Sequence, residues 1–84
     1  MSAWLRCTTE PGMLPGEYAV EIDTSENGRV SLFAPEDKVR AADKLIRIEV
    51  LEENGAGVLV CLPSPAFEIS SRTVKVPRNA LVQA

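Results

Sequence analysis

The residue types that most often carry catalysis are scarce in this chain. It contains no histidine and only two cysteines, Cys7 and Cys61, which lie far apart in the sequence. Without histidine, the commonest general base and the commonest neutral metal ligand are both missing. The cysteines also lack the close spacing of structural zinc sites. The sequence therefore predicts neither a catalytic triad nor a metal site.

Paired carboxylates are the remaining candidates for acid–base chemistry. The adjacent acid pairs are Glu36-Asp37 and Glu52-Glu53. Both lie where a turn or a helix start is expected, and adjacent residues on a strand point to opposite faces, so neither pair forms a natural dyad. No glycine-rich phosphate-binding motif is present either. We therefore predict no catalytic residue and no cofactor, and we do not expect an enzyme.

Length and composition indicate one small globular domain over residues 1–84. The chain has 45% hydrophobic and 25% charged residues, within the range of folded proteins. It contains no apolar run of the ~20 residues that a membrane helix needs, and its first residues lack the pattern of a signal peptide. We expect a cytoplasmic protein without membrane contact, in which both cysteines are reduced.

The distribution of charge suggests one alternative function. The net charge is −3, but three bases fall in the last part of the chain and form a candidate basic strip: Arg72, Lys75 and Arg78. In a nucleic-acid-binding barrel these bases would contact phosphates while aromatic side chains stack on bases. The acidic pI of about 4.9 argues against this alternative, because phosphate backbones bind clustered positive charge. We expect solvated strand charges, and nucleic-acid binding that is weak or absent at physiological salt.

Hydrophobic periodicity predicts β-structure along most of the chain. Tyr18–Asp23 alternates apolar and polar residues, and Asn27-Gly28 supports a tight turn into a strand over Arg29–Phe33. A second hairpin joins Leu45–Leu51 to Val58–Leu62.

The segments between and beyond these hairpins are expected to be less regular. Thr8–Gly16 reads as a long loop, and Pro63-Ser64-Pro65 is expected to end the strand before it. Pro35–Ala42 suggests a short helix, with a plain loop as the alternative, because proline suits the first helical position but the segment is barely two turns long. Short strands are expected at 73–76 and 80–82.

The order of these elements resembles that of SH3-like small barrels. A first strand and a long loop with Gly12 and Pro15 precede the hairpins, and Val74–Val82 looks like a strand, a single helical turn and a closing strand. The resemblance implies an all-β barrel of five to six short antiparallel strands. No binding motif of a known family accompanies it, so it carries little information about function.

Large apolar side chains outside the expected core are candidates for an interaction surface. Trp4 lies near the terminus, Phe67 follows a proline-rich loop, and Met13-Leu14 sits within the long loop. Adding the strand residue discussed next, the candidate surface comprises Trp4, Met13, Leu14, Leu59 and Phe67.

The strand over 58–62 consists entirely of apolar residues, which cannot all face one core. Since side chains on a strand alternate, Leu59 and Cys61 are expected on the outer face, where Leu45 and Leu51 of the neighbouring strand would join them. Such an apolar stripe needs a cover, either from elsewhere in the chain or from a second molecule, most simply in a two-fold dimer.

These observations favour a small non-catalytic binding or assembly module. The expected partner is another protein or a second copy of the chain, with a homodimer slightly preferred. Two alternatives remain open: a nucleic-acid-binding barrel that uses the candidate basic strip, and a small-molecule-binding accessory subunit of an enzyme.

Overall fold

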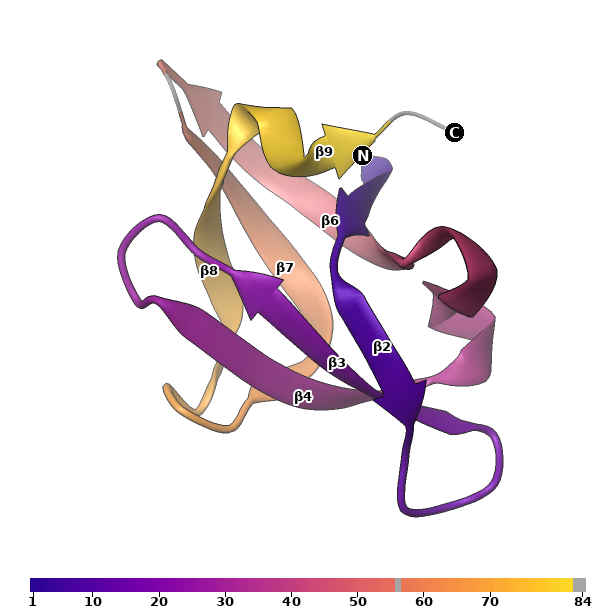
Figure 1. Ribbon diagram of the computed structural model, residues 1–84. Helices are drawn as coiled ribbons and strands as arrows, with labels where there is room; N and C mark the ends of the chain where they lie inside the picture. The colour runs from indigo at the N-terminus through magenta and orange to yellow at the C-terminus, as the bar shows by residue number, and fades with distance from the viewer. Residues whose placement is uncertain (56, 83–84) are drawn as a thin grey trace.

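Two antiparallel β-sheets face each other in the computed structural model, which describes residues 1–55 and 57–82 (Figure 1). The larger sheet has the strand order β8-β7-β6-β1-β9, with β5 paired to β6, and the smaller has the order β2-β3-β4. The strands are β1 (Ser2–Arg6), β2 (Thr8–Pro11), β3 (Glu17–Asp23), β4 (Arg29–Pro35), β5 (Val39–Arg40), β6 (Leu45–Asn54), β7 (Gly57–Ala66), β8 (Ser71–Pro77) and β9 (Leu81–Val82).

The core lies between the sheets and is entirely aliphatic at its centre. The expected alternation on β7 is confirmed, because Val58, Val60 and Leu62 are buried while the residues between them are only partly so. The same period of two buries alternate positions of β3 and β4. The largest fully buried side chains are Leu5, Val20, Ile22, Val30, Leu32, Ile46, Val58, Val60, Leu62 and Val76.

Backbone hydrogen bonds outside the strand ladders hold the corners where the chain leaves a sheet. The chain passes from one sheet to the other at Cys7, between β1 and β2, where the Cys7 N–H donates to the Lys44 carbonyl at 3.0 Å. At another corner the Ser25 N–H donates to the Lys75 carbonyl at 2.9 Å. The ladders of the described strands stay in two separate sheets and do not close into a barrel.

The predicted hairpins and the predicted C-terminal ending are confirmed. Strands β3 and β4 form an antiparallel hairpin in which Asp23 pairs with Arg29 next to the turn. Gly28 in this turn has a φ of +67°, a conformation that favours glycine. Strands β6 and β7 pair around the second predicted turn. At the C-terminus, β8 is followed by the single 3₁₀ turn η3 (Arg78–Ala80) and then by β9.

The helix expected over 35–42 is wrong. The segment forms two 3₁₀ turns, η1 (Glu36–Lys38) and η2 (Ala41–Asp43), on either side of β5. Val39 of β5 is 9% exposed and pairs with Ile46, so burial of this side chain holds the middle of the segment in an extended conformation. No side chain caps either turn, which is consistent with the absence of continued helical structure.

Two strand boundaries also differ from the prediction. The expected loop over 8–16 begins with β2, which pairs with β3 from Thr8 to Pro11. Strand β7 continues through Pro63 and Pro65 to Ala66, although its register with β8 shifts between Cys61 and Ala66. Proline at an irregular stretch of a ladder removes no regular strand hydrogen bond, so the extended conformation survives there.

The aliphatic core predicts a clear contrast between two leucine substitutions. Leu5 is completely buried, so Leu5→Ala should lower the free energy of unfolding by about 2–5 kcal/mol. Leu51 is 54% exposed, so Leu51→Ala should change it by less than about 0.5 kcal/mol. Urea denaturation of both variants measures the difference. Equal losses of stability would contradict this arrangement of the core.

Candidate functional site

The five residues expected to form one interaction surface do not lie together. Trp4 is only 9% exposed, so its placement on an open surface is wrong. The guanidinium of Arg40 lies over its ring at 4.2 Å from the centroid, and that of Arg47 at 5.8 Å. The two arginine side chains therefore cover the Trp4 ring through cation–π contacts, although Trp4 is not part of the aliphatic core cluster.

The apolar stripe expected around Leu59 is interrupted by polar neighbours. Leu59 lies between Glu52 and Lys75 in the register of β6, β7 and β8, and it is only partly exposed. Leu45 is buried, contrary to the expectation that it emerges on the outer face. Leu51 sits at the register shift between Val50 and Glu52, where a bulge turns it outward. The stripe therefore offers no continuous apolar surface.

The candidate basic strip is also divided. The Arg72 guanidinium donates to the carbonyls of Leu62 and Pro63, at 3.1 and 3.2 Å. At the other end of β8, Arg78 donates to the Gly55 carbonyl at 3.0 Å and pairs with Glu53. Both arginines are thus held by contacts within the chain.

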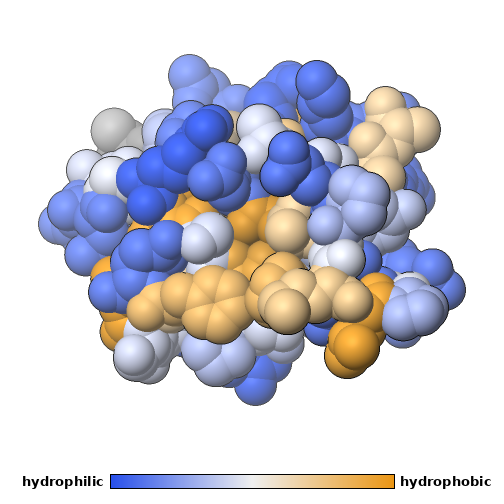
Figure 2. Space-filling model, turned by 60° about the horizontal axis from the view of Figure 1, so that its bottom comes forward, coloured by the Kyte–Doolittle hydropathy of each residue, from blue (hydrophilic) through white to orange (hydrophobic). Residues whose placement is uncertain are grey.

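The remaining candidates, Met13, Leu14 and Phe67, gather at one end of the molecule. They are 82%, 66% and 61% exposed. Figure 1 places the Met13-Leu14 loop and the β7–β8 turn at the same lower end of the fold. Figure 2 shows this end, where a band of apolar side chains runs between hydrophilic residues. We call this surface, formed by Met13, Leu14, Phe33 and Phe67, the apolar end.

Two adjoining concavities give the apolar end its shape. The first lies at the Met13-Leu14 loop and the second beside Phe33 and Phe67, and Glu17 lines both. The Phe33 and Phe67 rings meet edge to face, with centroids 5.3 Å apart, a favoured geometry for aromatic pairs. Glu17 is therefore the residue at which the Met13-Leu14 concavity meets the one beside the aromatic pair.

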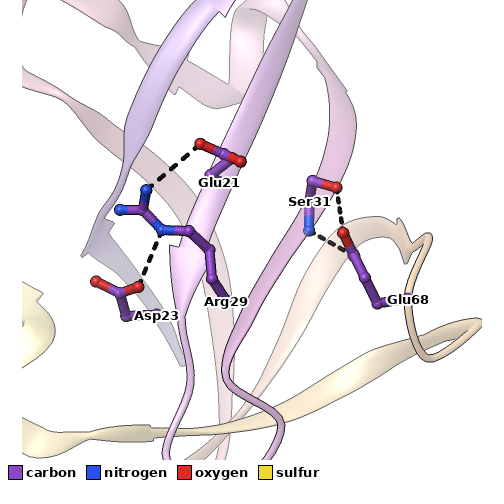
Figure 3. A network of polar contacts seen from close by, with 5 residues as sticks. All are labelled: Glu21, Asp23, Arg29, Ser31 and Glu68. Carbon is purple, nitrogen blue, oxygen red and sulfur yellow. Dashed lines mark hydrogen bonds and ion pairs between the residues drawn. The ribbon is translucent and has the colours of Figure 1, made fainter.

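The β7–β8 turn is fixed to the edge of β4 by Ser31. The Phe67 N–H donates to the Ser31 carbonyl at 2.8 Å, and the Ser31 N–H donates to Glu68 Oε1 at 2.7 Å. The Ser31 hydroxyl donates to Glu68 Oε2 at 2.6 Å (Figure 3). These donors keep the pKa of Glu68 below its ordinary value, because they stabilise the carboxylate. The exposed Phe67 thus rests on an anchored backbone.

The Met13-Leu14 loop is anchored at both ends as well. The Gly12 N–H donates to the Glu17 carbonyl at 2.9 Å, and a Cβ at Gly12 would lie 2.8 Å from that oxygen. Gly16 has a φ of +78°, and its carbonyl accepts a hydrogen bond from Glu36. Glycine is therefore required at both hinges of the loop.

A second polar network in Figure 3 has no comparable role. Arg29 contacts Asp23 at 3.0 Å and Glu21 at 3.5 Å on the exposed face of the β3–β4 hairpin. Ion pairs between solvated side chains contribute little to stability. We interpret this network as surface charge of the hairpin.

The part of the chain that the structure describes contains no cluster of metal-ligating side chains. None of the helices in residues 1–55 and 57–82 is long and apolar enough to cross a membrane. Comparisons with protein-family models, with curated proteins and with solved structures gave no match to this chain.

Both cysteines are free and partly buried. Burial raises the pKa of the Cys7 thiol to about 11, so at pH 8 only about one molecule in a thousand carries the nucleophilic thiolate. In a Cys61→Ser variant, labelling of native Cys7 by a thiol reagent should accelerate about tenfold per pH unit up to about pH 10. A rate that levels off near pH 9 would contradict this. Labelling of the unfolded wild-type protein should count two thiols.

The Ser31–Glu68 contact predicts an acid-sensitive turn. Because the pKa of Glu68 is lowered in the folded state, its stabilising contribution is complete above the ordinary value of 4.5 and is lost as the pH falls through the lowered pKa. Glu68→Gln should therefore destabilise the protein at pH 7 and have a much smaller effect near pH 3. Urea midpoints measure both. Glu26→Gln in the β3–β4 turn is the control, and an equal effect of both variants would refute the assignment.

Proposed function

We propose that this protein is a non-catalytic binding module whose apolar end docks a different protein, through a segment that combines apolar side chains with lysine or arginine. The observation that carries the proposal is an exposed aromatic and aliphatic surface on two anchored loops, with acids as its charged neighbours. The module supplies a rigid platform, and any chemistry belongs to the partner.

The apolar end has the energetic character of a docking surface. Met13, Leu14 and Phe67 leave most of their area in water, and full burial of each would contribute roughly 1.5–3 kcal/mol. The hydrogen bonds at Gly12 and Ser31 already fix the backbone beneath them. Less conformational entropy is then lost on association, which favours binding by a preorganised surface.

Charge determines which occupant fits. Glu17 and Glu36 are the charged side chains that line the two concavities. A two-fold dimer whose axis passes near Glu17, the residue that lines both concavities, would bring the two copies of this carboxylate together, and such like-charge contacts disfavour association. A basic, apolar segment of another protein is complementary instead.

The fold is part of the same proposal. We infer an open variant of the SH3-like small barrel, because the bend at Cys7, the two hairpins and the η3 turn before β9 follow the order of elements in those barrels. The bonds from Ser25 to Lys75 and from Phe67 to Ser31 bridge the sheets where ladder pairing would close a barrel. We also propose a cytoplasmic location, consistent with two free thiols.

A selection from a random peptide library tests the docking surface. Peptides selected on the wild-type protein should be enriched both in apolar residues and in lysine or arginine. Phe67→Ser and Met13→Ser should each weaken their binding by roughly tenfold or more, since each removes an apolar contact. Fluorescence anisotropy of a labelled selected peptide measures the affinities.

Leu51→Ser is the matched control, because Leu51 is similarly exposed but lies on β6. It should leave peptide affinity unchanged. Selected peptides that are insensitive to Phe67→Ser would refute the proposed surface. Light scattering across a dilution series tests whether a second copy of this chain occupies the apolar end instead. A dimer that dissociates on dilution and is abolished by Phe67→Ser would show that the partner is a second copy and not a different protein.

A further inference from the structure

A third concavity lies beside Trp4, and its charged lining side chains are Arg40, Arg47 and Glu53. It has a volume of about 460 Å³, with apolar contributions from Ala3, Val50 and Leu81. This surface is separate from the apolar end and does not enter the function proposed above.

Strand pairing brings the two arginines to the same indole ring. Trp4 on β1 is the cross-strand neighbour of Arg47 on β6, so both side chains leave the sheet on one face. Arg40 comes from β5, which pairs with the other edge of the same β6 segment. Its guanidinium carbon lies 4.2 Å from the Trp4 centroid, and that of Arg47 lies 5.8 Å away. The buried ring thus holds two cationic side chains in place before any ligand arrives.

Neither of these arginines forms an ion pair within residues 1–55 and 57–82. The nearby acids are engaged elsewhere. Glu49 accepts a hydrogen bond from the Ser2 hydroxyl at 2.9 Å and pairs with the Met1 ammonium. Glu53 pairs with Arg78 at 3.4 Å. Neither guanidinium therefore has a salt-bridge partner among the described residues, although the charge of Arg47 contributes to the lowered pKa of Glu49.

We propose that this concavity binds a small phosphate monoester, with Arg40 and Arg47 as the residues that hold its phosphate group. Each guanidinium offers a planar fork of N–H donors, and a phosphate dianion has enough acceptor oxygens to engage both. A carboxylate carries one charge and is satisfied by a single fork. The carbon skeleton of the ester rests against Ala3, Val50 and Leu81.

Intrinsic fluorescence measures this binding directly, because Trp4 is the single tryptophan of the chain. Titration with phenyl phosphate and with inorganic phosphate, against potassium chloride at matched ionic strength, should give a saturable change in Trp4 emission. Phenyl phosphate should bind more tightly, since its ring gains the apolar contacts. Arg40→Gln and Arg47→Gln should each weaken binding by roughly tenfold or more.

Two controls separate a built site from general attraction. Lys75→Gln removes one charge from the same sheet away from Trp4 and should leave the affinity unchanged. Arg47→Lys keeps the positive charge but loses the planar fork of N–H donors, so its affinity for phenyl phosphate should lie between those of the wild type and of Arg47→Gln. Thermal unfolding of each variant verifies that it is folded. Because Phe67 lies outside this concavity, Phe67→Ser should bind phenyl phosphate normally, whatever the result of the peptide experiment.

Three results would overturn the proposal. The first is an emission change no larger than that caused by chloride. The second is an equal loss of affinity in Lys75→Gln and in the two arginine variants, which would indicate unspecific electrostatic attraction. The third is a single-stranded oligonucleotide that displaces phenyl phosphate and binds more tightly, which would make the arginines part of a nucleic-acid surface.

Discussion

The structure depends on the burial of alternate aliphatic side chains between two facing sheets. A chain this short can enclose only a small core, and valine, leucine, isoleucine and alanine fill the space between the inner faces. The larger aromatic residues are placed elsewhere. Trp4 lies beneath two arginines, Phe67 is exposed beside Phe33, and only Tyr18 packs partly against the core.

This division leaves large side chains free to define surfaces. An aliphatic core sets the spacing of the sheets, and the corners are then held by backbone bonds and by short polar contacts such as the one between Ser31 and Glu68. No buried side-chain nitrogen or oxygen among the described residues lacks a hydrogen-bond partner. The loops are held at the sheet edges by backbone and side-chain hydrogen bonds.

The two proposed surfaces differ in the chemistry that they recognise. The apolar end presents Met13, Leu14 and Phe67 next to acidic side chains, which suits a basic and apolar protein segment. The Trp4 concavity presents two unpaired guanidiniums, which suits an anion. Because they occupy different elements, a phosphate ester and a protein partner could be bound at the same time.

The sequence by itself determined the all-β class, both hairpins and the inward set on β7, because a period of two and the turn residues at Asn27-Gly28 depend only on neighbouring positions. It also made Met13, Leu14 and Phe67 candidate surface residues, since the first two lie in a loop of prolines and glycines and Phe67 follows Pro63-Ser64-Pro65. The extended conformation of Val39 was not predictable, because it results from pairing with Ile46.

Only the tertiary structure decided where the charged and aromatic side chains meet. Arg40 and Arg47 carry no motif, and they reach Trp4 because β5 and β1 both pair with β6. The same pairing covers Trp4, which the sequence placed on an open surface. The expected basic strip is divided because Arg72 and Arg78 bind different partners within the chain. Local patterns specify which face a side chain takes, whereas strand order and register specify its neighbours.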